Sequence, residues 1–463
     1  MKLLKKINKL LLVAIMSTLC IFLINPQKAT VDAATSTYRG KVQEIRAVWV
    51  SHFAGDVHAY SDEESYKSEI LGILDNMESM GFNTMIFHIR THNNALYKSK
   101  LNPVASFWSA VDFDEFDPLE WMIEECHSRG IEFHAWLNPY RIKAKGFPEG
   151  YKEQDIANLY KDYPNNPASD ASNILLNDST GAILNPCKEV VQKYIIDVCL
   201  ELMANYNIDA IHFDDYFYAK MTEKNEALLE DDQTDYIEYI KNNPNCGYKV
   251  DCEADKKDWR RENVDKFIHD LSVAMRKFNK ENNRQVQLGI SPTGIYMNGN
   301  GEVTYDENGT AITNGSNTNG QEHYASYLYC DSKKWVDNEW IDYIIPQTYW
   351  GLTHPVAGFA DLTDWWDKVV ANKKVNLYCG MGIYMTFRQA GAYSWTENAY
   401  EASDEVLYCS KKEFVKGTCV FSFKSLVRCI NDEATLPHIA TERIRKEYWN
   451  NKIKTPKTIA TGK

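Results

Sequence analysis

Two adjacent carboxylates, Asp214 and Asp215, stand at the end of the predicted strand Ala210–Tyr216 and form the strongest chemical signal in the sequence. Hydrolysis of a glycosidic bond needs two carboxyl groups, because one protonates the leaving oxygen and the other meets the positive charge that develops on the sugar. Repulsion between neighbouring carboxylates raises one pKa, as a general acid requires. We therefore predict that Asp214 is the charged catalytic group and that Asp215 is a candidate acid.

Three alternatives stay open at this point. Asp214 could instead be a structural carboxylate paired with Arg90 or His88. The substrate could supply its own nucleophile through an N-acetyl group, with Tyr349 assisting. Carboxylates in predicted loops could replace Asp215 as the acid, namely Asp56, Asp178 and Glu322.

Polar and aromatic side chains recur where the predicted strands end. Strand alternation places them toward a common axis, where an inert core would have Val, Ile and Leu. Arg90 is expected to bind a substrate hydroxyl or carboxylate or to keep Asp214 ionised, and Trp136, Tyr140 and Trp350 are expected to stack on sugar rings. The full set of predicted substrate-binding residues is His88, Arg90, Trp136, Asn138, Tyr140, Arg141, His212, Tyr216, Ser291, Gln347, Tyr349, Trp350 and Tyr384.

The same alternation assigns three further kinds of position. His134 and Gln287, deep along the axis, are interpreted as members of an internal hydrogen-bond network. Ser422 is expected to face the axis. Trp49 is given helix-facing parity, so it is assigned to packing.

Eight β-rich runs must position these side chains. Helical stretches with 3.6-residue periodicity, such as Tyr66–Met80, Pro118–Arg129 and Glu189–Tyr206, separate them. Alternation of strand and helix implies parallel pairing, and eight units imply a single closed (β/α)8 barrel, a TIM barrel of the α/β class. The predicted strands are Ile45–His52, Thr84–Arg90, Glu132–Arg141, Ala210–Tyr216, Val286–Thr293, Tyr343–Trp350, Asn376–Tyr384 and Thr418–Phe423.

The connections differ in length on the two faces of this predicted barrel. The turns from helix to strand are tight, whereas the segments from strand to helix are long, at about 142–187, 217–258 and 294–322. Such loops form the catalytic face of a barrel, so we expect a deep cleft there. The last of them is expected to contain a hairpin around residues 306–309. Residues 34–450 are assigned to the barrel, with 424–450 as its closing helix and 451–463 as a basic tail.

The first 33 residues have the pattern of a secretory signal. A lysine-rich start precedes the apolar run Leu10–Ile24, and Val31-Asp32-Ala33 provides small residues for cleavage. We expect a secreted protein that begins at Ala34, is associated with the cell wall and has no stable membrane insertion after cleavage. An uncleaved anchor is the alternative.

The amino-acid composition limits the classes of binding partner that can be expected. The net charge is −13, and removal of residues 1–33, which hold five Lys and one Asp, would make the chain more acidic, so nucleic acid is not an expected partner. The 28 Tyr and 12 Trp supply flat amphipathic rings that suit sugars. No Cys and His spacing resembles a zinc site, and neither metal nor cofactor is expected. A disulfide between Cys246 and Cys252 is an alternative to free thiols, and a monomer is expected.

The motifs together resemble the glycosyl hydrolase-like family 10 proteins over most of residues 44–425. The resemblance implies an exported barrel glycosidase, with members linked to peptidoglycan glycan strands. The sequence departs from the family pattern at His88, where Gln is usual, and at Asn93-Asn94, where Gly-Asp is usual. The resemblance is carried by Arg46–Val50, Phe87–Arg90 with Ala95–Ser99, His134–Arg141, Leu184–Pro186, His212–Tyr216, Ser291–Gly294 and Pro346–Trp350.

The leading hypothesis is therefore a hydrolase of β-linked, N-acetylated wall glycan. A non-catalytic carbohydrate-binding barrel is the first rival, because it would use the same aromatic residues. A hydrolase of another extracellular polysaccharide is the second. A metal-dependent deacetylase is a third, although its clustering of Asp and His is not evident.

Overall fold

The computed structural model describes residues 37–108, 112–148, 150–177, 181–218, 232–325, 328–388, 394–433 and 435–457. The predicted signal segment, Asp178 and residues 458–463 of the predicted tail lie outside the described residues. Within the described part of the chain, no helix has the length and apolar character needed to cross a bilayer.

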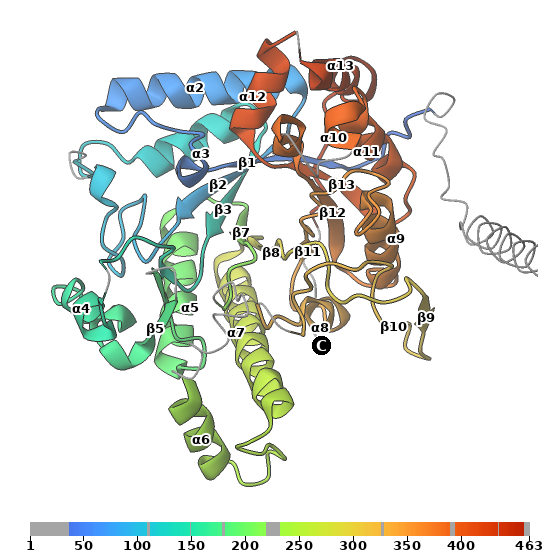
Figure 1. Ribbon diagram of the computed structural model, residues 1–463. Helices are drawn as coiled ribbons and strands as arrows, with labels where there is room; N and C mark the ends of the chain where they lie inside the picture. Colours follow the sequence, from blue (N-terminus) through green and yellow to red (C-terminus); the bar gives the residue numbers. More distant parts are fainter. Residues whose placement is uncertain are drawn as a thin grey trace, which may run out of the picture. The chain divides into compact units, whose positions relative to one another are not determined.

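Eight parallel strands close into a barrel, which confirms the predicted fold (Figure 1). The first strand pairs with the second and also with the last, Ile45 lying opposite Gly417 and Ala47 opposite Thr84. Around the barrel the order is β1-β13-β12-β11-β8-β7-β3-β2. The bounds are β1 Ile45–Val50, β2 Thr84–Arg90, β3 Glu132–Leu137, β7 Ala210–Phe213, β8 Gln287–Ile290, β11 Tyr343–Ile344, β12 Asn376–Met381 and β13 Val415–Val420.

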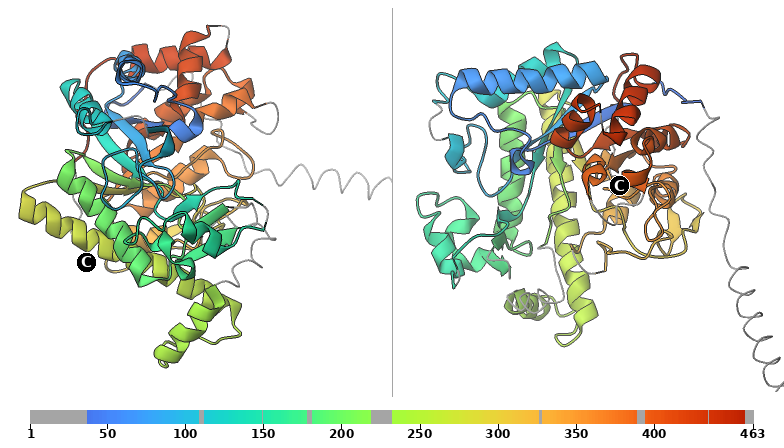
Figure 2. Two further views of the ribbon diagram at one scale, coloured as in Figure 1. Left: turned by 90° about the vertical axis from the view of Figure 1, so that its left-hand side faces the viewer. Right: turned by 45° about the horizontal axis from the view of Figure 1, so that its top comes forward.

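Helices surround the strands in the three views (Figures 1 and 2). The longest, α7, has 30 residues, and α6 projects from the barrel beside its first turns. The bounds are α2 Glu63–Met80, α3 Pro118–Ser128, α4 Glu153–Asn158, α5 Glu189–Asn205, α6 Gln233–Asn242, α7 Glu253–Asn282, α8 Ser332–Asp337, α9 Phe359–Val369, α10 Ser394–Glu397, α11 Glu401–Ser410, α12 Phe423–Asn431 and α13 Leu436–Arg443.

Helix α2 illustrates how the sequence sets these elements. The side chain of Asp62 caps its start by accepting from the backbone N–H of Ser65, and acidic residues fill the first turn. Its buried residues are spaced three or four apart, so one face packs on the barrel. Gly81 ends the helix with a φ of 80°, and a Cβ there would lie 2.6 Å from the carbonyl oxygen of Trp449. Glycine is therefore required by both backbone and space.

Extra structure lies at the mouth, the end of the barrel where the strands finish. A three-stranded antiparallel sheet has the order β4-β6-β5, with β4 Arg141–Lys143, β5 Ile174–Asn177 and β6 Gly181–Leu184. The hairpin predicted in the 294–322 loop is confirmed, since β9 Val303–Tyr305 pairs antiparallel with β10 Ala311–Thr313. The long loops are thus partly ordered insertions.

The closing segment is not the single helix predicted over 424–450. Two helices, α12 and α13, and a short π-helical turn at Ile444–Tyr448 replace it. Pro437 stands in the first turn of α13, where its missing N–H costs nothing, whereas it would break a continuous helix. The chain then crosses the foot, the end where the strands begin, and Lys454 accepts a 2.9 Å hydrogen bond from the N–H of Glu44.

Two predicted side-chain directions in the barrel are wrong. Trp49 packs in the barrel interior with Ala47 and Trp136, because β1 is buried on both faces and gives no alternation to read. Phe421, rather than Ser422, faces the axis, because Cys419 points into the barrel interior and alternation from it brings Phe421 to the same side. The polar pocket above this interior therefore has a more aromatic base than predicted.

The cysteines of the described chain are all free thiols. Cys246 and Cys252, the pair considered for a local disulfide, are half-buried and unbridged. Cys126 and Cys199 are buried in helices, where a thiol packs as a small hydrophobe.

Candidate active site

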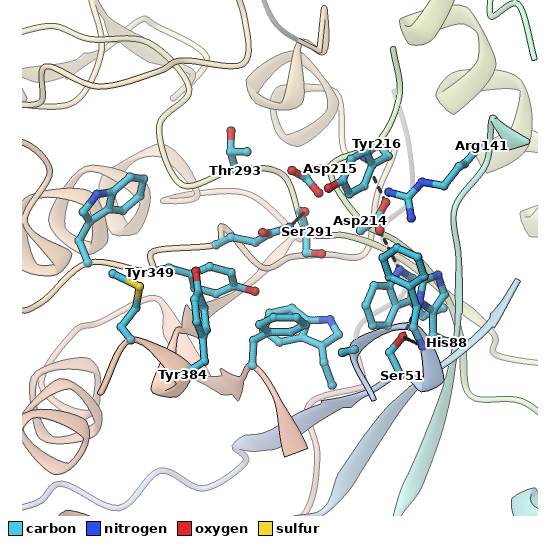
Figure 3. A pocket seen from close by; sticks show the side chains of 18 of the residues that line it. Ser51, His88, Arg141, Asp214, Asp215, Tyr216, Ser291, Thr293, Tyr349 and Tyr384 are labelled. Atoms are coloured by element: carbon cyan, nitrogen blue, oxygen red, sulfur yellow. Dashed lines mark hydrogen bonds between the residues drawn. The ribbon is translucent and has the colours of Figure 1, made fainter. Parts of the chain in front are cut away.

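A pocket of about 450 Å³ opens at the mouth of the barrel (Figure 3). Its walls combine aromatic rings with a few polar groups, the composition typical of small-molecule and sugar sites. The residues that line it are Trp49, Ser51, Phe53, Ala54, His88, Trp136, Arg141, Asp214, Asp215, Tyr216, Ser291, Thr293, Gln347, Tyr349, Trp350, Tyr384, Met385, Arg388 and Phe421.

Among these lining residues, Asp214 and Asp215 are the only carboxylates. Asp214 is 4% exposed. Its Oδ2 accepts hydrogen bonds from the indole N–H of Trp136 at 3.1 Å and from the side-chain amide of Asn138, and its Oδ1 accepts from the backbone N–H of Tyr216 at 3.1 Å. Three donors thus fix this carboxyl group at the end of β7, whereas Asp215 is only half-buried and faces the pocket (Figure 3).

The environment raises the pKa of Asp214 to about 7. Burial is the main cause, followed by the negative charge of Asp215. Arg141, the N–H of Tyr216 and the amide of Asn138 act in the opposite direction. Adjacent carboxyls titrate as a pair, so the proton that Asp214 retains up to about pH 7 is shared with Asp215 and is available for acid catalysis.

The alternative loop carboxylates have other partners. Asp56 accepts from the backbone N–H groups of Ser51 at 2.8 Å and Lys424 at 2.7 Å, so it links the end of β1 to the first turn of α12. Glu322 accepts from the backbone and side chain of Asn298 within its loop. Neither lines the pocket, and the third alternative, Asp178, lies outside the described residues.

Arg141 provides a cation beside the carboxyl pair. Its guanidinium lies 3.8 Å from the ring centre of Tyr216 and 5.6 Å from that of Phe53. The residue is 5% exposed, and it forms no ion pair within 4.0 Å in the part of the chain that the structure describes. Phe53, by contrast, is 55% exposed at the rim, where it offers a ring face to a ligand.

The wall opposite the carboxyl pair is aromatic. Tyr349 stacks on Phe421 at 5.7 Å and meets Tyr384 edge-on at 5.8 Å. Burial, together with the charges of the neighbouring groups Tyr384, Asp215 and Asp214, raises the pKa of Tyr349 well above its usual range. Its hydroxyl therefore stays protonated and faces the pocket as a donor (Figure 3).

His88, a departure from the family pattern, is part of the pocket. Its ring stacks flat on Trp136, with centres 3.7 Å apart and planes at 4°, and its Nδ1 lies 2.9 Å from the Ser51 hydroxyl. Burial holds the pKa of His88 well below its usual value, so the ring is neutral. His88 thus supports Trp136, which in turn binds Asp214.

Four predicted substrate-binding residues do not line the pocket. Arg90 is buried, with its guanidinium bound to Asn93, Asn102 and the carbonyl oxygens of residues 138 and 139. Tyr140 packs against Phe267 at 5.5 Å. Asn138 and His212 lie beneath the surface, Asn138 holding Asp214 and His212 bonding to Trp49, Ser291 and Tyr343. The other predicted residues all line the pocket.

Several residues that line the pocket are not among the site residues predicted from the sequence. Phe53 and Ala54 belong to a 3₁₀ turn after β1, and Met385 to another at Ile383–Phe387. Such turns lack the periodicity from which inward positions are read. Thr293 stood within the recognised Ser291–Gly294 motif and could have been inferred from it. The remaining ones are Trp49, Ser51, Arg388 and Phe421.

No cluster of three or more His, Cys, Asp or Glu side chains suited to a metal ion occurs in the described residues. The groups that the pocket presents are the two carboxyls, two arginines, hydroxyls, one amide and aromatic rings. Chemistry at this site can therefore be built from proton transfer and electrostatic stabilisation by these side chains.

Comparison with known proteins finds relatives that are described as glycosyl hydrolases. It is 30% identical to glycosyl hydrolase YngK of Bacillus subtilis over 390 residues, which span 83% of this chain and 69% of that one. It is 29% identical to glycosyl hydrolase DigH of Escherichia coli K12 over 67% of this chain and 64%, less than two thirds, of that one.

The glycoside hydrolase domain of PgaB (BpsB) from Bordetella bronchiseptica has the same fold, with a TM-score of 0.51 at 10% identity over 88% of this chain and 98% of that domain. The model of the glycosyl hydrolase-like 10 family matches residues 44–394, and the chain belongs to that family.

Proposed function

We propose that the protein is an exported glycoside hydrolase that cleaves β-linked glycan of the cell wall at N-acetylated sugars. The observation that carries the proposal is the isolated carboxyl pair. Asp214 and Asp215 are the only carboxylates among the described pocket-lining residues, and the pKa of Asp214 is about 7. The family membership and the aromatic walls support a sugar substrate.

The placement of the pair favours an acetamido sugar. A retaining glycosidase that uses its own nucleophile needs a second carboxylate on the sugar face opposite the acid. Here the opposite wall presents the hydroxyls of Tyr349 and Tyr384 (Figure 3). A 2-acetamido group can fill this role itself, because its carbonyl oxygen can attack the anomeric carbon intramolecularly.

The roles follow from exposure and hydrogen bonding. Asp215, the more exposed of the pair, passes the proton that the pair shares to the leaving oxygen as the glycosidic bond breaks, which leaves both carboxyl groups ionised. Asp214, held as an acceptor by Trp136 and Asn138, accepts the acetamido N–H and stabilises the positive charge of the ring that forms. Tyr349 orients the acetamido group. Water then opens this intermediate, and Asp215 takes back a proton as general base.

The proposal is tested by reducing-end release from a glycan panel. Protein comprising residues 34–463 should cleave peptide-free wall glycan or chitooligosaccharides and leave α-glucans intact. The double variant Asp214→Asn/Asp215→Asn provides the matched blank. Turnover confined to glycans without acetamido groups would contradict the mechanism. Tight sugar binding by wild type without turnover of any glycan would favour the carbohydrate-binding rival.

The pH profile gives a second test. If the singly protonated pair is the active form, kcat/KM should fall as pH rises through about 7, where the last proton leaves. Arg141 lowers the pKa of Asp214, so Arg141→Gln should move this basic limb to higher pH. Arg388→Gln removes a more exposed pocket arginine that is not among the causes of the shift, and it should leave the limb in place. A downward move in Arg141→Gln would refute the assignment.

A further inference from the structure

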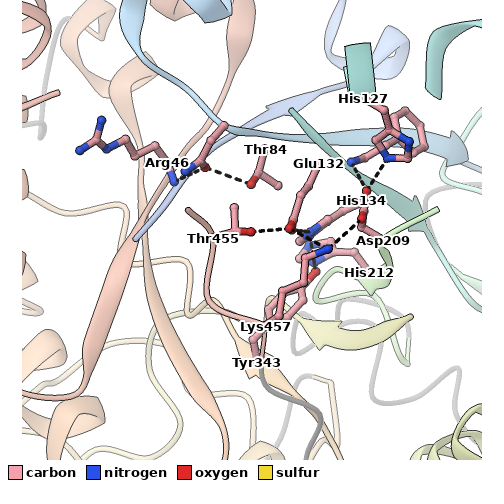
Figure 4. Close-up of polar contacts among 12 residues, drawn as sticks. Arg46, Thr84, His127, Glu132, His134, Asp209, His212, Tyr343, Thr455 and Lys457 are labelled. Carbon is pink, nitrogen blue, oxygen red and sulfur yellow. Dashed lines mark hydrogen bonds and ion pairs between the residues drawn. The ribbon is translucent and has the colours of Figure 1, made fainter. Parts of the chain in front are cut away.

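Below the pocket, four side chains form a hydrogen-bonded column along the barrel axis (Figure 4). This axial column consists of Glu132 and His134 from β3, Tyr343 from β11 and His212 from β7. Glu132 Oε2 lies 3.3 Å from His134 Nε2, His134 Nδ1 lies 2.9 Å from the Tyr343 hydroxyl, and that hydroxyl lies 3.1 Å from His212 Nδ1. The column thus runs from the foot of the barrel to the base of the pocket.

The indole of Trp49 shows the direction of every bond in the axial column, because it identifies the nitrogen of His212 that must accept. An indole N–H can only donate, and Trp49 Nε1 lies 3.2 Å from His212 Nε2. His212 is neutral, because burial, the largest cause, holds its pKa well below the usual value. Its Nε2 must therefore accept, and its single proton must sit on Nδ1.

The remaining proton positions follow one by one. His212 Nδ1–H donates to the Tyr343 oxygen, so the Tyr343 hydroxyl proton points to His134 Nδ1. His134 then carries its proton on Nε2, toward Glu132. A protonated His134 would donate from Nδ1 as well and leave the Tyr343 proton without an acceptor in the column.

The foot of the axial column is anchored by an ionised carboxylate. Burial opposes ionisation of Glu132, but hydrogen bonds from His134 and Thr455 keep its pKa below the usual value. Thr455 Oγ1 donates to Glu132 Oε1, and Lys457 Nζ lies 3.3 Å from the same oxygen. The chain end that crosses the foot thereby fixes the acceptor at the start of the column.

A glycine on the neighbouring strand makes space for the ring of Tyr343 in the barrel interior. A Cβ on Gly289 of β8 would lie 1.8 Å from the ring of Tyr343, so glycine there opens the space that the ring fills. Tyr343, His134 and His212 are each 0% exposed. The column therefore occupies the barrel centre, where these three side chains are closed off from bulk solvent.

We propose that Tyr343 and His134 are positioning residues for the glycosidase site, a role that rests on the proposed function. They hold His212 in the Nδ1–H tautomer, and its Nε2 then binds Trp49 and lies 3.1 Å from the Ser291 hydroxyl. Trp49 and Ser291 both line the pocket. The opposite tautomer would set the N–H of His212 against that of Trp49 and displace the indole, which also meets Tyr349 and Phe421 edge-on.

The test removes one oxygen atom from the middle of the axial column. The variant Tyr343→Phe, in protein comprising residues 34–463, keeps the ring and loses only the hydroxyl. In ¹⁵N NMR spectra of histidine-labelled protein, the signals of His212 should no longer be those of a pure Nδ1–H tautomer. With a chitooligosaccharide, kcat/KM should fall at least about tenfold, because small displacements of positioning groups are costly to catalysis. The NMR measurement needs no substrate, so it tests the column even if wild type turns over no glycan, a result that would sink only the proposed function.

A neighbouring tyrosine supplies the control. Tyr378 lies inside the barrel with its ring 5.3 Å from that of Tyr343, and among the described residues its hydroxyl takes no part in the hydrogen bonds that link the two histidines of the column. Tyr378→Phe should keep the His212 signature and leave kcat/KM within about twofold of wild type. If Tyr343→Phe does not fold, Glu132→Gln tests the column from its foot and should alter the signals of His134 and His212. Unchanged tautomers in a folded Tyr343→Phe or Glu132→Gln protein would overturn the proposal.

Discussion

Asp214→Asn should lower kcat at least about a hundredfold, a loss of roughly 3 kcal/mol of transition-state stabilisation. The carboxylate accepts from Trp136, Asn138 and the N–H of Tyr216. An amide of the same shape can keep its oxygen toward the first two, but its NH₂ then faces the N–H of Tyr216 and no negative charge remains. Steady-state kinetics on a chitooligosaccharide, with binding of the same sugar measured by calorimetry, would separate lost chemistry from lost affinity.

Affinity should survive Asp214→Asn within about tenfold, because the aromatic walls and Arg141 are untouched. Asp215→Asn is the internal comparison. If Asp215 is the acid, this variant should slow the hydrolysis of substrates with poor leaving groups far more than that of activated aryl glycosides, which need little protonation. Full activity of Asp214→Asn would defeat the proposed chemistry.

Arg90→Met should destabilise the folded protein by about 3 kcal/mol or more. The guanidinium donates to Asn93 Oδ1 at 2.6 Å, Asn102 Oδ1 at 3.0 Å and the carbonyl oxygen of Asn138 at 2.6 Å. Methionine fills much of the volume but leaves these buried acceptors without this donor. Urea unfolding followed by circular dichroism would give the change in the free energy of unfolding.

Arg388→Met is the matched control for Arg90→Met. Arg388 is exposed at the pocket, so its loss should change stability by less than about 0.5 kcal/mol. If Arg90→Met instead unfolds like wild type and only raises KM, Arg90 contacts substrate and the structural role is refuted.

The barrel could be predicted because its strands and helices alternate at regular spacing, and because short turns such as that at Gly81 mark where helices end. The carboxyl pair could also be found from the sequence, since Asp214 and Asp215 directly follow a strand. Side-chain direction was harder to predict. The strand β1 is buried on both faces, so the inward direction of Trp49 leaves no trace in hydrophobic alternation.

Arg90 shows a different limit. A shift in the pairing of β2 with β3 falls between His88 and Arg90, so counting by twos from His88 fails at the very end of the strand. The side chain turns into the loop that follows and binds Asn93 and Asn102 there. Neither the shift nor the loop path is encoded in a local pattern. For this reason the sequence pattern predicts a substrate-binding role for Arg90, whereas the structure gives it a structural one.

The pairing of β1 with β13 also constrains the order in which the protein can be completed. Ile45 and Gly417 are neighbours in the barrel although most of the chain separates them. A chain that emerges from its N-terminus therefore keeps one edge of β1 unpaired until Val415–Val420 has been made. An unpaired strand edge can pair with a strand of another chain. A growing chain therefore exposes a site for intermolecular pairing until β13 has been made. Late closure thus makes the unpaired edge of β1 the place where an incomplete chain is most exposed to pairing with other copies of itself.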